Sequence, residues 1–451
     1  MFYNVLLSTY FILFAALSCL RLNWAVYLII FALPGYLIRF QIFGIPMTLL
    51  ESMILILFLA LAIKKSGNLE IRKLKQIIIN HKLYYFIILF LSAATVSVFV
   101  SPDPRAALGI WKAYFIEPIL FLLVFVSVID KYKLKNIFLA FSSSAFLLSL
   151  IAIYQKITGN LISNSFWAAE ATRRVTSVFE YPNALALYLP PIIILIIGFG
   201  IAQIKKVKNW NFNNYLFIIY HLLFVGIVVA STIFTKSKGA IIAILAGLIF
   251  YAIFYKNYRK YFISLLTIIF ISLYLYIFIF GLPDLRGVAT VDGGDSITTR
   301  INMWQETWAM LKDRPIFGAG LAGYQTIIAP YHQKNYIEIF LYPHNIFLTF
   351  WSEIGLLGLV VFLLIIAWFY KIGFNKNLLV AHYPLPIVLM ASMTTLLIHG
   401  LVDTPYFKND LSVLFWLLIG SIIILNKKMA TKTKTRYNYI ENSFLNYSLK
   451  R

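Results

Sequence analysis

The chain has few charged residues and almost no cysteine, and both shortages narrow the possible protein classes. Only 12% of its 451 residues are charged and 61% are hydrophobic, whereas soluble domains have about 25% charged residues. The single cysteine, Cys19, excludes an internal disulfide and any cysteine cluster for zinc or iron–sulfur. This composition excludes a soluble globular protein, and an aromatic content of 17% argues against a disordered one.

Long apolar runs are abundant, and they predict membrane-spanning helices. A spanning helix needs about 20 mainly apolar residues, which gives about 12 or 13 candidate spans in this chain. Backbone polar groups in lipid must be satisfied within the segment, so we expect an all-α polytopic bundle. The first run is expected to be a retained helix rather than a signal peptide. The candidate spans are 2–20, 24–40, 44–63, 83–100, 113–129, 137–155, 183–203, 215–234, 239–255, 262–282, 345–370, 379–401 and 411–426.

The charge distribution predicts the orientation in the membrane. The net charge is +22, and one set of alternate connections holds most of the lysines and arginines but few acids. Such connections stay in the cytoplasm. The excess of basic residues therefore indicates the membrane topology and contact with anionic lipid, not nucleic-acid binding. The cytoplasmic set is Arg21, 64–82, 131–135, 205–208, 256–260, 371–376 and the tail from Lys427. The outer set is 101–112, 156–182, 235–238, 283–344 and 402–410.

The longest outer connection, 283–344, is expected to be ordered and functional. Apolar residues at helical spacing predict a helix from Ile297 that ends by Arg314, before Pro315, and its tryptophans suit the membrane interface. The glycines of 315–324 allow close backbone approach. We expect Asp292 and Asp295 to be turn and cap residues rather than metal ligands, so the sequence predicts no metal site and no cofactor.

Cations and histidines gather at the outer membrane surface rather than at the bilayer midplane. The cations are Arg174 (with Arg173 as an interchangeable rival), Lys238 and Arg300. A transporter for a polar solute would place its ionisable groups midway, whereas surface cations suit a lipid diphosphate. His344, at a loop–helix junction, is the best candidate for an acid or base.

Each of these residues also has an ordinary structural interpretation. Lys238 could extend its amine to the headgroup region, Arg300 could bond a carbonyl, and His344 could cap a helix. Arg300 lies in the first turn of its helix, where a cation opposes the helix dipole, so we expect a partner outside the helix. Glu353 is expected to have a structural partner, and His399 is expected to pair with Asp403.

Six short segments, in order between about residues 170 and 420, resemble the O-antigen ligase and O-antigen polymerase superfamily of bacterial membrane glycosyltransferases. Taken together on one face, they are more specific than any one segment. They are Arg174-Val-Thr-Ser-Val-Phe-Glu-Tyr-Pro-Asn183, Thr235-Lys-Ser-Lys-Gly-Ala240, Arg300 with Trp304, Pro315-Ile-Phe-Gly-Ala-Gly320, Pro343-His-Asn-Ile-Phe347 with Glu353-Ile-Gly355, and His399-Gly-Leu-Val-Asp403.

The resemblance implies metal-independent, inverting transfer of a glycan from undecaprenyl diphosphate to an acceptor hydroxyl, at the outer face of the cytoplasmic membrane. It makes His344 the base and Arg300, Lys238 and Arg174 the diphosphate ligands. The family usually has Ser-Arg-Gly where this chain has Ser237-Lys238-Gly239, and lysine lacks the bidentate fork of arginine. Supporting roles fall on Asn183, Ser237, Asn345, Glu353, His399 and Asp403.

The sequence therefore predicts three regions: N-terminal transmembrane helices at 1–165, a ligase-like core at 166–426 that includes the outer loop 283–344, and a basic cytoplasmic tail at 427–451. The expected partners are a carrier-linked glycan donor, a glycan or lipid acceptor such as a lipopolysaccharide core, and the bilayer. Three alternatives stay open. The first is a polymerase that joins carrier-linked repeats, or a ligase that modifies protein. The second is a lipid-linked glycan transporter, and the third is a non-catalytic membrane scaffold.

Overall fold

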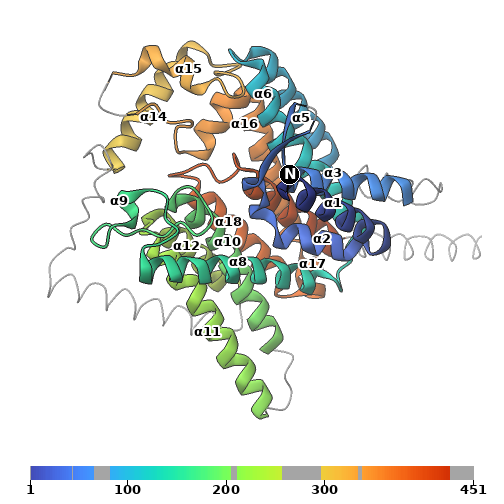
Figure 1. The fold of residues 1–451 in the computed structure, drawn as a ribbon. Helices are drawn as coiled ribbons and strands as arrows, with labels where there is room; N and C mark the ends of the chain where they lie inside the picture. Colours follow the sequence, from blue (N-terminus) through green and yellow to red (C-terminus); the bar gives the residue numbers. More distant parts are fainter. Residues whose placement is uncertain are drawn as a thin grey trace, which may run out of the picture.

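A computed structural model describes residues 2–42, 44–64, 82–204, 211–255, 296–333 and 338–426 (Figure 1), and the structural statements below concern these residues. The predicted all-α membrane fold is confirmed. Within these ranges seven helices are long and apolar enough to cross a membrane, or eight if one bent pair counts as a span. The predicted span 262–282, the outer-loop residues 283–295 and the tail 427–451 lie outside the described residues, as do most of the basic segments 64–82, 205–208 and 256–260.

The N-terminal region departs from the expected pattern of helices alone. The predicted span 24–40 is wrong in its second half, because the helix ends at Phe31. Pro34 and Gly35 follow in a short 3-10 turn, and a proline inside an α-helix removes a backbone hydrogen bond. A two-stranded antiparallel hairpin then leads into the next helix. The elements are α1 (Phe2–Leu20), α2 (Leu22–Phe31), η1 (Leu33–Leu37), β1 (Arg39–Ile42), β2 (Ile45–Thr48) and α3 (Leu49–Lys64).

The segment after α5 (Leu83–Val100) also differs from expectation. Residues 101–112 were predicted to be a connection, but α6 (Pro104–Trp111) occupies most of them. The Asp103 side chain accepts from the Ala106 N–H at 3.0 Å, and Pro104 takes the first helical position. Both features are strong helix-start signals. A π-helical turn, η2 (Lys112–Ile116), continues into α7 (Glu117–Val128), and the Lys112 amine binds Glu51 of α3 at 2.5 Å.

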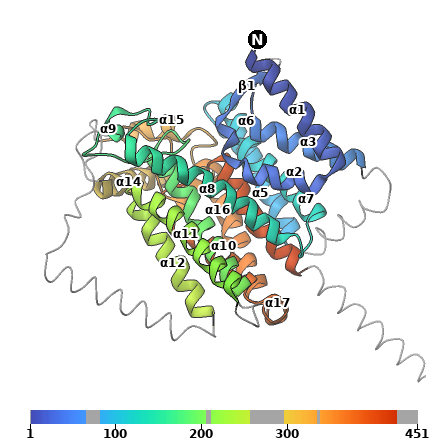
Figure 2. The ribbon, with the colours of Figure 1, turned by 60° about the horizontal axis from the view of Figure 1, so that its bottom comes forward.

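The helix α10 is one of the most deeply buried helices that the structure describes. α10 packs against both α12 and α18, and most of its side chains are buried despite two internal prolines. Figure 2 shows α10, α11 and α12 side by side on one side of the molecule. The elements of this region are α8 (Leu134–Thr158), α9 (Ser165–Ala168), α10 (Pro182–Ile204), α11 (Phe212–Phe234) and α12 (Lys238–Phe254).

The outer loop contains the helix that the sequence predicts. α14 (Ser296–Asp313) ends just before Arg314 and Pro315, and α15 (Tyr324–Ile328) and η3 (Ala329–Tyr331) follow the glycine-rich segment. In both views α9 and α14 lie on one side of α16 (Ile346–Gly373), while α1, α2 and α3 lie on the other side (Figures 1 and 2). The chain thus surrounds the start of α16 with two separate groups of elements.

The long helix α16 is interrupted at Gly355, where the glycine-rich segment contacts it. Gly355 has φ 70° and ψ 179°, a conformation essentially confined to glycine. The next residue, Leu356, donates its N–H to the Ile316 carbonyl at 2.9 Å, and the Ala319 N–H donates to Ser352 at 2.6 Å. The interruption of α16 therefore provides backbone partners for the outer loop.

We expect Gly355→Ala to destabilise the protein by roughly 1–3 kcal/mol, because alanine is strained in this backbone conformation. An added Cβ would also lie 2.4 Å from the Ile316 carbonyl oxygen. Thermal unfolding of the purified protein in detergent measures the effect. Gly226→Ala is the matched control, since nothing lies within 4 Å of that position in α11 and alanine favours helix. Equal melting temperatures for the two variants would contradict this account of the interruption.

The last described helices return the chain to the start of α16. The predicted span 379–401 is bent, because α17 (Lys376–His382) and α18 (Leu385–His399) meet at 110° around Tyr383-Pro384. After His399 the chain turns through 400–408 into the helix Asn409–Asn426, which is 94% buried. The turn 400–408 lies beside the start of α16, since the Ile346 N–H donates to the Gly400 carbonyl at 2.7 Å.

Candidate active site

Helix ends and loops from several of the six sequence segments meet around the turn 400–403. Arg300 of α14 donates from Nε to the Val402 carbonyl at 2.8 Å. The Asn345 amide donates to the Leu401 carbonyl at 3.0 Å. At the start of α12, a Cβ on Gly239 would lie 2.9 Å from Val402 and 3.2 Å from His399, so only glycine permits this approach. Segments up to about 160 residues apart in the chain thus form one cluster.

His344 and Asp403 form the polar pair of this cluster. Nδ1 of His344 lies 3.1 Å from Oδ1 of Asp403, and the His344 side chain is 25% exposed whereas that of Asp403 is 7% exposed. A carboxylate that binds Nδ1 favours the tautomer with its proton on that atom, which leaves the Nε2 lone pair available as a base. The partly exposed imidazole can therefore meet a substrate while its other nitrogen is held in place.

The backbone around His344 is strained and firmly anchored. His344 has φ 44°, a left-handed conformation that is uncommon for residues other than glycine and concentrates at functional sites. On one side, the Pro343 carbonyl accepts from the Trp304 indole at 2.9 Å. On the other, Asn345 caps α16 by accepting from Phe347 and Leu348 at 3.0 and 3.1 Å. These contacts fix the direction of the imidazole.

Asp403 is ionised in this environment. Burial alone would raise the pKa of Asp403, but His344, His399 and Arg300 together outweigh burial and hold the pKa below its usual range. The Thr404 N–H also donates to Oδ1 at 2.9 Å. The carboxylate can therefore orient His344 and stabilise an imidazolium when His344 accepts a proton.

We expect Asp403→Asn to lower transfer at least about 10²-fold, since an amide that donates to Nδ1 would place the imidazole proton on Nε2. The folded-state pKa of Asp403 is lowered. The ionised Asp403 therefore contributes its full stabilisation at pH values above its pKa in the unfolded chain, about 3.9. This stabilisation is lost as the pH falls through the pKa of Asp403 in the folded protein. Denaturant unfolding should show that the wild type stays more stable than the variant from about pH 8 down to about pH 5. A difference that disappears within that window would contradict the ionised pair.

Arg174 connects the segment 174–183 to the segment 235–240 and interacts electrostatically with Arg300. Its Nε donates to the Thr235 carbonyl at 2.8 Å, and Nη2 donates to Oδ1 of Asn183 at 2.9 Å. Burial lowers the pKa of Arg174, and the positive charge of Arg300 lowers it further. Two guanidinium groups that repel each other in a partly buried site favour the binding of an anion between them.

Lys236 extends this cationic group, and the sequence interpretation did not include it among the ligands. Burial lowers the pKa of Lys236, and the charges of Lys156 and Arg174 lower it further. The residue has φ 54° at the sharp turn between α11 and α12. Its neighbour Lys238, the predicted ligand, begins α12 and is exposed, while Ser237 caps that helix through the Ala240 N–H at 3.3 Å. The sequence has a lysine on each side of Ser237, but spacing alone does not indicate which of the two would bind an anion.

The structure separates the two adjacent arginines that the sequence left interchangeable. Arg173 binds the carbonyls of Ala168 and Lys156 at 3.0 and 3.1 Å, so it braces the α9 loop. Arg174 points to Thr235 and Asn183 instead. Buried Gln155 holds the backbone that follows Arg174, because its Oε1 accepts from the N–H groups of Thr176 and Ser177 at 2.9 and 2.7 Å.

Two predictions about supporting residues have structural outcomes. Asp403 hydrogen-bonds His344. It also interacts electrostatically with His399, the partner that the sequence indicated. Nδ1 of buried His399 has no hydrogen-bond partner in the described chain. Arg300 has its expected partner outside the helix in the Val402 carbonyl.

Glu353 lies away from the imidazole and holds the glycine-rich segment. It is fully buried in α16, and its Oε2 accepts from the Ala322 N–H at 2.8 Å. Gly318, with φ 65°, allows that segment to approach the Trp351 carbonyl, which would be 2.4 Å from a Cβ. The expected structural partner of Glu353 is therefore backbone rather than a cation.

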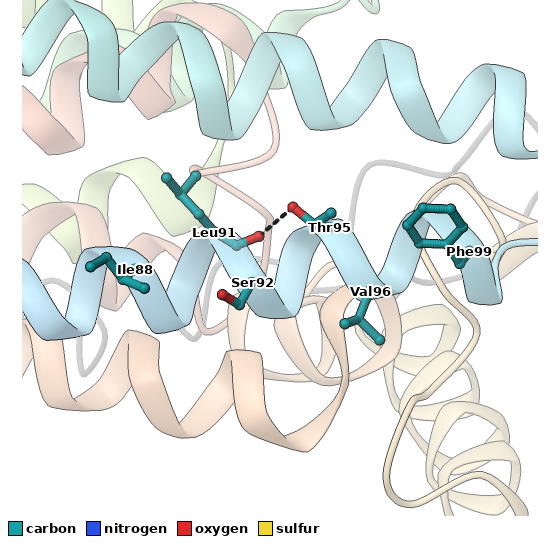
Figure 3. A pocket seen from close by; sticks show the side chains of 6 residues that line it. All are labelled: Ile88, Leu91, Ser92, Thr95, Val96 and Phe99. Atoms are coloured by element: carbon teal, nitrogen blue, oxygen red, sulfur yellow. Dashed lines mark hydrogen bonds between the residues drawn. The ribbon is translucent and has the colours of Figure 1, made fainter.

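A separate groove of about 420 Å³ runs along one face of α5 and is lined by Ile88, Leu91, Ser92, Thr95, Val96 and Phe99. Figure 3 shows these side chains on a single helix face, where the Thr95 hydroxyl donates to the Leu91 carbonyl at 2.7 Å. The lining has no ionisable group, and Phe99 is 83% exposed. This groove suits hydrocarbon rather than chemistry, so it is distinct from the His344 site.

Comparison with known proteins gives a match with a family model. Residues 222–363, about a third of the chain, match the family model described as O-antigen ligase. This segment is similar to the O-antigen ligase family. The matched segment contains Lys236, Lys238, Arg300, His344 and Glu353, so it covers most of the cluster described above. A comparison with curated proteins gave no match. The described residues contain no group of three or more His, Cys, Asp or Glu side chains that could hold a metal ion.

Proposed function

We propose that this protein transfers a glycan from a polyprenyl-diphosphate carrier to an acceptor hydroxyl, at the outer face of the cytoplasmic membrane. The observation that carries the proposal is the position of the His344–Asp403 pair beside the cations Arg300 and Arg174. Asp403 interacts with both His344 and Arg300, so a base and an anion site lie within one cluster. Glycosyl transfer from a diphosphate needs both groups.

The reaction follows from the roles of these groups. Nε2 of His344 accepts the proton of the acceptor hydroxyl as its oxygen attacks the anomeric carbon of the donor sugar. The bond between that carbon and the diphosphate oxygen breaks, and the electron pair leaves with the diphosphate. Asp403 stabilises the resulting imidazolium. A single displacement of this kind inverts the configuration at the anomeric carbon.

The cationic group supplies the stabilisation of the leaving group. Negative charge grows on the diphosphate in the transition state, and preorganised cations lower its energy. Arg174 and Arg300 are held by backbone carbonyls, so little reorganisation of these two side chains is needed. Lys238, at the N-terminus of α12, adds a further cation and the positive end of a helix dipole. Ser237, Asn183 and Asn345 hold these groups in place.

The side of the membrane follows from charge. The connections at the opposite ends of the helices carry the lysine-rich segments, which are retained in the cytoplasm. The cluster of loops 169–181, 235–237, 343–345 and 400–408 therefore faces outward, where the carrier presents its glycan. The apolar groove on α5 is available to a hydrocarbon chain at membrane depth.

Reconstituted transfer tests the proposal. Purified full-length protein in nanodiscs is incubated with polyprenyl-diphosphate oligosaccharide, with and without a lipid-core acceptor, in the presence of a chelator. We expect consumption of the donor with release of polyprenyl diphosphate. Growth of the glycan on the carrier without an added acceptor identifies a polymerase, and transfer only to the core identifies a ligase. Movement of intact donor across the bilayer without bond cleavage would support a transporter instead.

A further inference from the structure

Four tyrosines from four separate parts of the chain converge beside His344. They are Tyr36 in η1, Tyr114 in η2, Tyr181 before α10 and Tyr342, two residues before His344. Tyr36 interacts electrostatically with both Tyr114 and Tyr181, and Tyr342 interacts with Tyr114 and Tyr181. We call these four residues the tyrosine cluster.

The turn 406–408 holds the cluster together. The Phe407 ring lies 6.2 Å from that of Tyr114 and 5.3 Å from that of Tyr342. The amine of the next residue, Lys408, lies 4.8 Å from the centre of the Tyr181 ring. These contacts place three of the four tyrosines against one short segment that starts the helix Asn409–Asn426.

The hydroxyls of Tyr36 and Tyr181 are not used by the fold. Neither makes a side-chain hydrogen bond to a described residue, and Tyr181 is 39% exposed. Tyr342 lies deeper, and its buried side chain faces that of Tyr114. Aromatic rings with free hydroxyls, beside the carboxylates of Glu180 and Asp410, can bind the apolar faces and hydroxyl groups of a sugar.

Tyr36 and Tyr114 lie on the opposite side of α16 from the cationic group, whereas Tyr181 follows Arg174 in the same loop. Asp403 interacts with Arg300 and also with Tyr181. The cations come from the α9 loop, the α12 turn and α14, whereas Tyr36 and Tyr114 come from the N-terminal elements, on the other side of α16 (Figures 1 and 2). In a single displacement the nucleophile enters opposite the leaving group. The diphosphate therefore occupies the cationic side, and the acceptor enters from the tyrosine side.

We propose that Tyr36, Tyr114, Tyr181 and Tyr342 form the subsite for the acceptor sugar. This inference rests on the proposed function. It assigns a substrate role to the N-terminal elements, which the matched segment 222–363 does not include. It also gives the hydroxyls of Tyr36 and Tyr181 partners in the hydroxyl groups of the acceptor.

Binding of soluble oligosaccharide tests the subsite without turnover. The probes are the oligosaccharide released by mild acid from the host cell's carrier-linked glycan and the core oligosaccharide of its surface lipid, each followed by saturation-transfer NMR on the full-length protein. We expect at least one probe to bind. Tyr36→Phe and Tyr181→Phe should each lower its affinity about fivefold, the value of one lost hydrogen bond. The matched control is Tyr154→Phe, which changes a half-exposed tyrosine in α8.

Three outcomes are distinguishable. Retained melting temperature with reduced affinity in both phenylalanine variants supports the subsite, because a purely structural tyrosine would alter stability and not sugar binding. Unchanged affinity in both variants, or no binding of either probe to the wild type, overturns it. Sugar binding that depends on the two hydroxyls, in a wild type that transfers no glycan, overturns the proposed function and leaves the subsite standing.

Discussion

His344→Asn is expected to lower glycan transfer by about 10²–10⁴-fold, the usual contribution of a positioned general base. Asparagine is the sharpest substitution because it tolerates a left-handed backbone, and His344 has φ 44°. It keeps a polar side chain near Asp403 but has no basic nitrogen. The variant should therefore fold and bind donor normally while turnover is lost.

His332→Asn is the matched control for this variant. His332 lies in the same outer loop and pairs through Nδ1 with Glu306 at 3.1 Å, away from the candidate site. Initial rates at saturating donor and acceptor, with melting temperatures for both variants, measure the difference. Transfer within about threefold of the wild type in His344→Asn would exclude His344 as the base.

Arg174→Ala is expected to lower transfer by about 10²–10³-fold, because it removes a preorganised donor to the leaving diphosphate. The adjacent Arg173→Ala is an unusually close control. Arg173 braces the α9 loop through the carbonyls of Ala168 and Lys156, so its loss should reduce stability and have little effect on the rate. Arg174→Lys, which keeps the charge, should recover part of the activity if the alanine variant folds poorly.

The rate at saturating donor and the apparent affinity for donor are measured for all three arginine variants. Equal losses in Arg173→Ala and Arg174→Ala would contradict the assignment of Arg174 to the diphosphate. A loss in Arg174→Ala that Arg174→Lys does not relieve at all would indicate that the bonds to Thr235 and Asn183, rather than the charge, are what the site requires.

The sequence was sufficient to predict the membrane class and most of the polar residues of the cluster, because both depend on local signals. Hydropathy defines the helices, and costly charges at helix ends indicate function. Asp103 and Pro104 are helix-start signals for α6, although the region was predicted to be a connection. The break after Phe31 followed from Pro34 in the same way.

Pairings between distant residues could not be predicted. His344 and Asp403 are 59 positions apart, and the alternative partner His399 lies only four residues from Asp403. Local spacing therefore indicated the electrostatic partner of Asp403 but not its hydrogen-bond partner. The choice between Arg173 and Arg174 depends on Gln155, which fixes the backbone of the following residues. The tyrosine cluster combines η1, η2 and two later loops, so no window of the sequence contains it.

The most direct test of the central claim separates binding from chemistry. Affinity for undecaprenyl diphosphate, which carries no sugar, is measured on the purified wild type, on His344→Asn and on the double variant Arg174→Ala/Arg300→Ala, with undecaprenyl monophosphate as the comparison ligand. We expect the wild type and His344→Asn to bind the diphosphate equally and the double variant to bind it at least about 10²-fold more weakly, since each lost charged hydrogen bond costs about 1.5–3 kcal/mol. Equal binding by all three proteins, or loss of binding in His344→Asn alone, would contradict the account.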